Sequence, residues 1–504
     1  MEYLITLDLG TTSVKTSLFS QKLVAVANYT QEYQLLTPAP KMVELDPQIY
    51  WDACIEGIKQ VLKTSKVSPD AVVSISISTQ GETLIPIDAD GKVLSNAIVW
   101  IDTRATEEAE NLKEIIGEVE YFRITGLPEI GSANPICKLI WIKKNLPAVY
   151  EKAHKFLLLE DFIIYKLSGE LVTEPTNMSS TGYFNVRENT LWLDCLEKSE
   201  IDPDKIPRVV PCGTVVGKIL ASAAEDTGLA LSTVIVTGAN DQICGAVGTN
   251  NISAGVVSET TGTALAIVCT LDTMPDKNLY NLSAISRHCN DKFIVVAYSA
   301  TSGIIYKWFK DVFCELEVRA SEADETDVYD GLNQLAESIP RGADGLLLLP
   351  FFAGKITPDY NEDARGVLFG VELRHTKGHF ARAILEGVAY MLREILEVTQ
   401  RLSGETNLVI STGGGSKSSL WNQIKADVID KEVCIAEGEG ASLGAAIIGA
   451  VSNGWYKSIE EACDASVTIT KRYFPDQDGV LAYQKLYDRF LLLYDSLLPV
   501  FDDK

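Results

Sequence analysis

The chain has 504 residues, of which 46% are hydrophobic, and its formal net charge at pH 7 is -25. This length suggests about two to four domains, and the hydrophobic fraction is ordinary for a globular protein. The acidic charge argues against binding to nucleic acid or to anionic membranes, because the long-range field repels phosphate groups. A local pocket for a small phosphorylated ligand remains compatible with this charge.

The cysteines and histidines give no sign of a disulfide framework or a metal cage. The ten cysteines are scattered, and no pair has the Cys-x-x-Cys spacing. We therefore expect reduced thiols and a cytoplasmic protein. His375 and His379 have the spacing of a metal pair on a helix, but no third ligand is evident. No run of 18 apolar residues occurs, so we expect neither secretion nor a membrane span.

The first half of the chain alternates strands and helices. Apolar runs predict strands, and a 3.6-residue apolar period predicts helices. Asp46 followed by Pro47 is a typical helix start, with an N-cap acid and proline at the first helical position. The predicted strands are residues 3–7, 23–27, 72–78 and 97–100, and the predicted helices are residues 47–63, 105–116, 136–145 and 160–167.

The second half continues the alternation. We expect strands at residues 234–237, 255–261, 264–268, 345–349, 408–411 and 432–435, and helices at residues 243–248, 302–314, 379–402, 418–430, 439–446 and 478–497. The acidic stretch 315–330 is interpreted as a solvated loop or helix surface. The strand–turn–strand unit at 255–268 is similar to the one at 3–27, which predicts an internally duplicated α/β architecture with a boundary near residues 245–255.

The turn after the first strand has the composition of a phosphate-binding loop. Asp8 ends the strand, Gly10 follows, and then come Thr11, Thr12, Ser13 and Lys15. Glycine lets the backbone approach a ligand, N–H and hydroxyl groups donate to phosphate oxygens, and the acid can orient Mg²⁺. The alternative is an ordinary hairpin turn.

Several other predicted strands also end in polar residues, notably at Gln80–Glu82, Asp102–Arg104, Asp241–Gln242, Thr261–Thr263 and Gly413–Ser416. In open α/β sheets, ligands bind outside the carboxyl ends of the strands. Of two acids in glycine-flanked turns, Asp8 and Asp241, one could organise a metal while the other accepts a proton from an attacking hydroxyl. Phosphoryl transfer needs both functions. Asp241 could equally cap the helix at 243–248.

The chain resembles the FGGY family of carbohydrate kinases. Residues 366–371 and 379–386 are similar to the family's C-terminal signature, and residues 135–141 are similar to its N-terminal signature. The resemblance extends from residue 2 to about residue 455. It implies an α/β fold with two duplicated actin-like (ribonuclease H-like) ATPase domains flanking a catalytic cleft. Residues 1–248 would form the N-terminal sugar-binding domain, and residues 249–504 the C-terminal nucleotide-binding domain.

The resemblance also assigns roles, with ATP and Mg²⁺ as cofactors. Asp241 would be the general base, and Asp8 and Asp241 would lie at the metal. The expected nucleotide-binding residues are Thr11, Thr12, Ser13 and Lys15 in the first phosphate loop, Thr261, Gly262 and Thr263 in the second, Gly303 and Lys307 before Trp308, and Gly414, Gly415 and Ser418 in the adenosine motif. A tight strand–helix turn is the structural alternative for the glycine run.

The substrate residues point to a small polyol. They are Gln80, Gly81, Glu82, Trp100, Asp102, Arg104, Asp241 and Gln242, which offer hydrogen-bond acceptors and one aromatic face. Gln80 and Glu82 resemble the glycerol kinase pattern, but Gly81 stands where that pattern has arginine. Residues 100–104 are closer to the Trp-x-Asp-x-Arg pattern of pentulose and gluconate kinases, and residues 353–358 and 364–366 are more similar to xylulokinases.

The resemblance therefore implies phosphorylation of a terminal hydroxyl of a ketopentose such as D-xylulose. The alternatives are a gluconate, glycerol, tetritol or other pentulose kinase, or a catalytically silent sugar or nucleotide sensor. The expected partner is a small sugar, with neither nucleic acid nor membrane, and a homodimer is left open.

Overall fold

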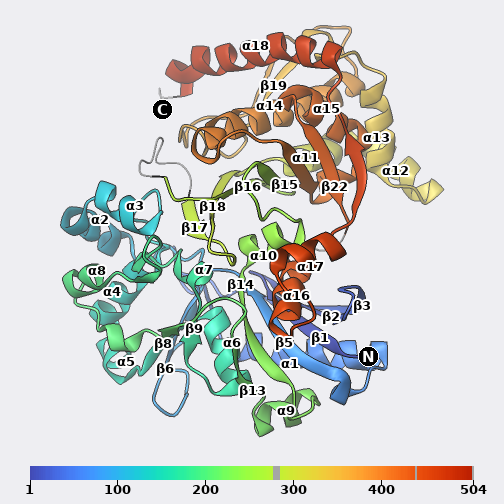
Figure 1. Cartoon of the computed structure of the whole chain (residues 1–504). Helices are drawn as coiled ribbons and strands as arrows, with labels where there is room; N and C mark the ends of the chain where they lie inside the picture. The colour runs from blue at the N-terminus through green and yellow to red at the C-terminus, as the bar shows by residue number, and fades with distance from the viewer. Residues whose placement is uncertain (276–283, 438–439, 502–504) are drawn as a thin grey trace.

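The computed structural model describes residues 1–275, 284–437 and 440–501. Two mixed α/β domains lie one above the other in Figure 1, each built around a twisted sheet. No helix in these described ranges is long and apolar enough to cross a membrane.

The first sheet has the strand order β13-β14-β5-β1-β2-β3. β1, β2 and β3 form an antiparallel meander, and β5 and β14 run parallel to β1. β13 closes the edge in the antiparallel direction. The bounds are β1 Tyr3–Leu9, β2 Ser13–Ser20, β3 Ala25–Glu32, β5 Val72–Thr79, β13 Val215–Lys218 and β14 Val234–Asn240.

The second sheet has the order β17-β18-β16-β15-β21-β22-β23. β15, β16 and β18 form an antiparallel meander, β21 and β22 run parallel to β15, and β23 is antiparallel to β22. The bounds are β15 Val256–Thr261, β16 Leu265–Leu271, β17 Ala284–Arg287, β18 Phe293–Ser299, β21 Leu408–Thr412, β22 Glu432–Ala436 and β23 Ile469–Tyr473.

The predicted duplication is confirmed by these two sheets. In each, a meander is followed by two parallel strands and an antiparallel edge strand, so β1, β5 and β14 correspond to β15, β21 and β22. A parallel neighbour needs a crossover, and helices supply it. The carboxyl ends of these strands carry the polar residues that the sequence singled out.

Helices cover both sheets. In the first domain they are α1 Pro47–Ser65, α6 Leu159–Ser168, α7 Pro175–Met178, α9 Ala221–Thr227 and α10 Asp241–Gly248. In the second they are α11 Gly303–Phe313, α12 Glu315–Asp324, α13 Val328–Glu337, α14 Lys377–Ser403, α15 Ser419–Ile429 and α18 Gln477–Phe501. Asp46 accepts a hydrogen bond from the Gln48 N–H, so the expected cap of α1 is present. α12 buries none of its side chains, as the acidic composition predicted.

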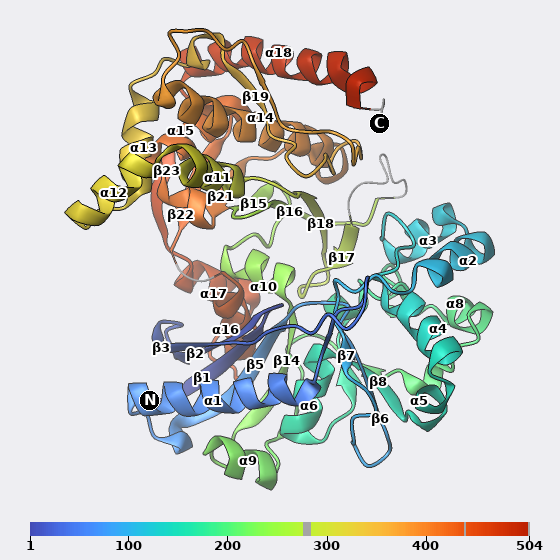
Figure 2. The same cartoon turned by 180° about the vertical axis from the view of Figure 1, so that it is seen from behind.

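Smaller elements extend the first domain on one side. A sheet of order β4-β7-β6-β8 and two short ribbons lie beside a group of helices (Figure 2). Their bounds are β4 Glu44–Leu45, β6 Leu84–Ile87, β7 Ala97–Ile98, β8 Lys155–Leu158, β9 Val172–Thr173, β10 Phe184–Asn185, β11 Thr190–Leu191, β12 Arg208–Val209, α2 Thr106–Ile116, α3 Glu118–Thr125, α4 Pro135–Asn145, α5 Pro147–Lys152 and α8 Leu193–Lys198. The second domain adds β19 Leu347–Leu349 and β20 Val367–Phe369.

Three sequence expectations need adjustment. The strand expected at 97–100 is only Ala97–Ile98, because the Asp102 N–H bonds the Val99 carbonyl and turns the chain. α14 begins two residues before His379, since the His379 ring accepts the Thr376 N–H and caps the helix. The expected helix start at Glu439 falls outside the described residues, and α16 is described from Gly440 to Ser452.

The chain returns to the first domain near its end. α16 and α17 (Ile459–Ser466) lie against α10 and the first sheet in both views (Figures 1 and 2). Leu4 of β1, Val247 of α10 and Ile447 of α16 share one buried cluster. A Cβ at Gly248 would lie 1.8 Å from the Gly440 carbonyl oxygen, so only glycine allows this approach of α10 and α16. The division of the chain at residues 248 and 249 stays a prediction.

Candidate active site

The expected first phosphate loop is the turn between β1 and β2. Thr11 and Thr12 lie in the turn, whereas Ser13 and Lys15 already belong to β2, with Lys15 directly opposite Asp8. The Gly10 N–H donates to the Ser13 carbonyl at 2.9 Å and makes the turn tight. Thr12 is exposed, so its hydroxyl is open to a ligand.

Asp8 is held at the end of β1 by its neighbour on β5. The Ser78 hydroxyl donates to Asp8 Oδ1 at 2.8 Å. Burial raises the pKa of Asp8, and the Ser78 hydrogen bond and the Lys15 charge only partly oppose that rise. Burial also lowers the pKa of Lys15, an effect that the Asp8 charge opposes.

Asp241 is the first residue of α10, directly after β14. The helix cap is its neighbour Asn240, whose Oδ1 accepts the Gln242 N–H at 3.0 Å, so the carboxylate of Asp241 is not used for capping. Burial is the main cause that raises the pKa of Asp241 to about 7, and the charges of Asp8 and Glu82 contribute to this rise. A carboxylate whose pKa lies near neutral pH is suited to accept a proton.

The expected sugar residues Gln80, Gly81 and Glu82 follow β5 and lie beside this acid pair. Gln80 is buried and donates from Nε2 to the Tyr50 hydroxyl at 3.2 Å, and its Oε1 has no partner among the described residues. Burial raises the pKa of Glu82, against the Lys138 charge and a Ser180 hydrogen bond. Glu82 also has a positive φ of 53°, which turns the chain at this point.

Gly81 is closely surrounded. A Cβ built there would lie 3.0 Å from Ser180 Oγ and 3.1 Å from Asn240 Nδ2. Both neighbours would have to move to admit any side chain. The arginine of the glycerol kinase pattern therefore does not fit this backbone without rearrangement.

Trp100, Asp102 and Arg104 follow β7 but do not act alike. Trp100 is 40% exposed, and its indole N–H donates to Thr11 Oγ1 at 2.9 Å, which joins the sugar side to the first phosphate loop. Asp102 is fully buried, and Arg104 donates to both of its carboxylate oxygens. Arg104 also donates to Glu44 at 2.7 Å. Asp102 and Arg104 thus hold the loop in place rather than present their charges to a substrate.

A buried loop beneath these residues escaped the sequence analysis. It runs through α7, where Glu174 caps the helix by accepting the N–H groups of Thr176 and Asn177. Thr176 Oγ1 in turn accepts the Asn240 N–H at 2.8 Å, next to Asp241. An acid followed by proline before Thr176 is a helix-start signal that could have revealed this loop.

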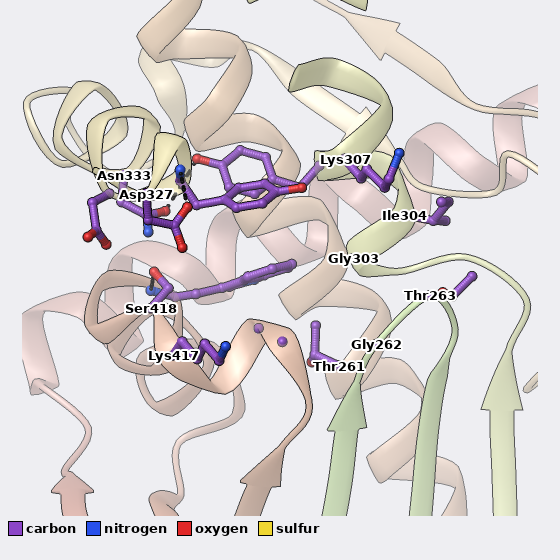
Figure 3. Close-up of a pocket in the computed structure, with 16 residues that line it drawn as sticks. Thr261, Gly262, Thr263, Gly303, Ile304, Lys307, Asp327, Asn333, Lys417 and Ser418 are labelled. Atoms are coloured by element: carbon purple, nitrogen blue, oxygen red, sulfur yellow. Dashed lines mark hydrogen bonds between the residues drawn. The ribbon is translucent and has the colours of Figure 1, made fainter. Parts of the chain in front are cut away.

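The expected nucleotide residues of the second domain line a single cavity of about 390 Å³. Figure 3 shows Thr261–Thr263 on one side, Gly303 and Lys307 above them, and Ser418 at the other end. The eight residues that the sequence singled out and the cavity brings together are Thr261, Gly262, Thr263, Gly303, Lys307, Gly414, Gly415 and Ser418.

The same cavity has a wall that the sequence did not predict. Three aromatic side chains line it, with Tyr306 at ring-centroid distances of 5.6 Å from Tyr329 and 5.9 Å from Trp421. The remaining lining residues are Ile304, Asp327, Asp330, Asn333 and Lys417. Aromatic faces and polar groups in one cavity suit a planar base. Tyr306 and Trp421 fall within predicted helices and Tyr329 within the acidic stretch 315–330, and no local pattern joins these three segments, which is why the wall was missed.

Thr261 differs from its expected role in one respect. Its side chain is buried, and its hydroxyl donates to Glu259 Oε2 at 2.8 Å while accepting from Lys425 Nζ at 2.8 Å. That hydroxyl is therefore engaged within the protein. Thr263 is exposed and makes no side-chain hydrogen bond in the described part of the chain, so its hydroxyl can face a phosphate.

The acid pair fits a magnesium ion that is shared with a nucleotide. No group of three or more histidine, cysteine or acidic side chains within the described residues forms a metal site by itself. Mg²⁺ is typically held by one or two carboxylates together with substrate phosphates. Asp8 and Asp241, whose pKa values rise through burial, offer such a pair of hard oxygen donors.

Comparison with known proteins places this site in a family. The model of the FGGY family of carbohydrate kinases, N-terminal domain, matches residues 3–248, and the C-terminal domain model matches residues 255–453. A xylulose kinase of Bacillus subtilis (strain 168) is 29% identical and covers 98% of this chain and 97% of its own. A gluconokinase of Bacillus licheniformis is 30% identical, over 98% of this chain and 96% of its own.

A solved structure gives the same result. The xylulose kinase from Rhodospirillum rubrum superposes with a TM-score of 0.90 at 27% identity, over 99% of this chain and 100% of the other. This superposition covers both of the regions that the two family models match, and it includes both sheets of the duplicated fold. The chain belongs to the FGGY family of carbohydrate kinases, which use ATP to phosphorylate sugars.

Proposed function

We propose that this protein transfers the γ-phosphoryl group of ATP to a terminal hydroxyl of a ketopentose such as D-xylulose. Asp241 carries this proposal. It lies beside Asp8 and Glu82 at the start of α10, outside the capping hydrogen bonds, and its pKa is raised to about 7. A general base with that pKa is largely ionised just above neutral pH and still takes up a proton readily.

The proposed reaction uses residues of both domains. The Asp241 carboxylate accepts the proton of the terminal hydroxyl, whose oxygen bonds the γ-phosphorus as the bond to ADP breaks. Lys15 and the turn residues Thr11 and Thr12 neutralise and orient the phosphates, with Thr263 opposite them. Mg²⁺, held by Asp8 and Asp241, would supply charge neutralisation at the transferring group. The aromatic cavity of the second domain holds the adenosine part.

The charges of the sugar side favour a neutral substrate. Asp8, Glu82 and Asp241 are three acids whose charges influence one another. Lys138 Nζ is buried and donates to the carbonyls of Glu82 and Val99, both at 3.0 Å, and Arg104 is paired with Asp102 and Glu44. Neither cation is directed at a substrate carboxylate, so gluconate would meet repulsion. A neutral ketopentose can hydrogen-bond with these carboxylates and with the amide groups of Gln80 and Gln242 without charge repulsion.

Other family substrates remain as alternatives to be tested. Glycerol is disfavoured because glycine stands at position 81 where the glycerol kinase pattern has arginine, and a side chain there would press on Ser180 and Asn240. Tetritols and other pentuloses share the neutral character of D-xylulose. A catalytically silent sensor would not need a base like Asp241.

We place the protein in the cytoplasm, since all ten cysteines are free and most are buried.

The test is a coupled ADP-release assay with ATP and Mg²⁺ over a substrate panel. The panel contains D-xylulose, D-ribulose, D-gluconate, glycerol and erythritol. We expect the highest kcat/KM with a ketopentose and the lowest with D-gluconate. A preference for D-gluconate would contradict the assignment of a neutral substrate. The absence of sugar-dependent ADP release from the whole panel would favour the sensor.

A further inference from the structure

An ion pair without solvent exposure lies directly beneath the second phosphate loop. Lys425 of α15 and Glu259 of β15 are 166 residues apart, and Lys425 Nζ lies 2.6 Å from Glu259 Oε1. Both side chains have 0% exposure. In β15, Glu259 occupies the same face as Val257, which belongs to the hydrophobic core. A charged residue therefore stands where the strand pattern favours an apolar one.

The hydrogen-bonding groups of this cluster are saturated. Lys425 Nζ donates to Glu259 Oε1, to Thr261 Oγ1 at 2.8 Å and to Ser411 Oγ at 3.2 Å, which uses all three of its protons. Glu259 also accepts from the hydroxyls of Ser411 and Thr261. Each hydroxyl thus donates once and accepts once. The cluster leaves Thr261 with a single side-chain orientation.

Thr261 is the point where three walls of the nucleotide cavity meet. A Cβ at Gly415 would lie 2.4 Å from Thr261 Cγ2, and one at Gly413 would lie 2.7 Å from the Thr261 carbonyl oxygen. A Cβ at Gly303 would lie 2.5 Å from the carbonyl oxygen of the next residue, Gly262. The adenosine motif and the start of α11 therefore both pack on the backbone of Thr261 and Gly262. A shift of Thr261 would move this backbone together with the adenosine motif and α11.

Stability alone does not account for the ion pair. Removing two charges from water costs about as much as their attraction returns, and apolar residues of similar size often replace such a pair without loss of stability. What an apolar pair cannot do is orient a hydroxyl. The geometry points to orientation of Thr261 as the contribution of this pair.

We propose that Glu259 and Lys425 are positioning residues that fix Thr261 and thereby set the second phosphate loop for ATP. The proposal rests on the proposed function, because it takes the 390 Å³ cavity to be the ATP site. Lys425 acts through Thr261 and not through contact with the nucleotide, since it is absent from the cavity wall and fully buried.

The experiment replaces the pair by apolar residues in the full chain. The double variant Glu259→Leu/Lys425→Met avoids leaving one buried charge unpaired, which would destabilise the fold. We expect its thermal midpoint to stay close to that of the wild type, and its Kd for ATP with Mg²⁺, measured by calorimetry without sugar, to rise on the order of 10-fold. The KM for sugar should not change, because the sugar residues lie in the other domain.

A matched control uses a second buried pair in the same domain. Lys355 Nζ lies 2.7 Å from Glu394, with side-chain exposures of 2% and 10%, and neither residue lines the cavity. Glu394→Leu/Lys355→Met should therefore keep the wild-type Kd for ATP. An equal loss of ATP affinity in both double variants would mean a general effect on the domain and would overturn the proposal.

Thr261→Val supplies a second route to the same conclusion if the double variant does not fold. It nearly preserves the shape of Thr261 but puts a methyl group in place of the hydroxyl that Glu259 and Lys425 bind, so the proposal predicts a similar rise in the Kd for ATP. A wild-type Kd in Thr261→Val, or in a folded Glu259→Leu/Lys425→Met, would overturn it. If the wild-type protein binds ATP but releases no ADP with any sugar, the proposed phosphoryl transfer is refuted. The role of Glu259 and Lys425 is still decided in that case, because the Kd values for ATP of the variants and the wild type are compared without turnover.

Discussion

Three carboxyl groups of the first domain, those of Asp8, Glu82 and Asp241, lie close enough to influence one another, and their proximity is unfavourable without a ligand. The pKa values of Asp8, Glu82 and Asp241 are all raised, with burial as the first cause in each case. Like charges in a desolvated region destabilise one another until a cation or a proton neutralises them. The arrangement is thus suited to a site that receives Mg²⁺ and a hydroxyl proton.

Glu82 is the residue whose removal should separate sugar binding from nucleotide binding. Its carboxylate lies near Asp241 and accepts from Ser180 on the floor of the sugar side. We expect Glu82→Ala to raise the KM for the ketopentose on the order of 10-fold, the cost of about one hydrogen bond, while the KM for ATP stays constant. Initial rates at varied sugar and fixed ATP measure this. An unchanged sugar KM would place Glu82 outside the sugar site.

At the scale of elements, the contact between α10 and α16 links the two halves of the chain. α10 begins with Asp241, and its last residue, Gly248, touches the first turn of α16 backbone to backbone. Helices approach this closely only where side chains are absent at the crossing. The packing of α10 on α16 thereby fixes the helix that carries the proposed base.

Two glycines of α10 make a matched pair for testing this contact. A Cβ at Gly248 would lie 1.8 Å from the Gly440 carbonyl oxygen, whereas a Cβ at Gly245 would meet nothing within 4 Å. We expect Gly248→Ala to lower the free energy of unfolding by about 1–3 kcal/mol through overpacking. Gly245→Ala should be neutral or stabilising by up to about 1 kcal/mol, because alanine favours helix. Urea unfolding measures both, and equal effects would contradict the crossing geometry.

At the scale of the whole molecule, the domains are joined at a second place besides α10 and α16. Arg287 of β17 donates to the carbonyls of Val186 at 2.6 Å and Arg187 at 3.0 Å in the first domain. Its own N–H donates to Ser179 Oγ, directly after α7 and beside Ser180. The second sheet thus touches the loop that lies beneath the sugar residues.

Loss of the hydrogen bonds that the Arg287 side chain donates to the first domain should weaken both the fold and sugar binding. Arg287→Ala removes two charge-assisted hydrogen bonds, so we expect the free energy of unfolding to fall by about 1.5–3 kcal/mol and the sugar KM to rise. The exposed Arg374, which pairs with Glu372, is a suitable control. Arg374→Ala should leave the unfolding free energy nearly unchanged, because an exposed ion pair contributes little. Identical results for the two variants would mean that the hydrogen bonds of Arg287 contribute nothing.

The duplicated fold could be predicted because its signals are local. The strand–turn–strand units, the Asp46 cap and the long amphipathic helix each depend on neighbouring residues. Thr261–Thr263 and Gly413–Ser416 were also foreseeable, because each group follows a predicted strand, whereas Gly303 and Ser418 were expected only from the family resemblance. By contrast, α16 is apolar on most sides, so its periodicity does not say which sheet it covers.

The rest of the site depends on contacts between distant segments. No pattern joins Lys425 to Glu259 across 166 residues, and Arg104 looks equally available whether or not Glu44 binds it. The engagement of the Thr261 hydroxyl follows from the same long-range contact. Residue type alone identified the chemistry that each group could perform, and packing decided which groups are free to perform it.

In the proposed reaction, Asp241 accepts the proton of the sugar hydroxyl. Its raised pKa, about 7, gives a direct measurement: kcat/KM for the ketopentose against pH, for the wild type and for Asp241→Asn. Below its pKa the carboxylate is protonated and cannot act, so wild-type kcat/KM should fall about tenfold per pH unit below neutral pH and level off above it.

The Asp241→Asn variant should have kcat reduced on the order of 10²–10⁴-fold, no inflection near neutral pH and an unchanged Kd for ATP measured without Mg²⁺. Turnover by Asp241→Asn at the wild-type rate, with the same pH profile, would contradict the account.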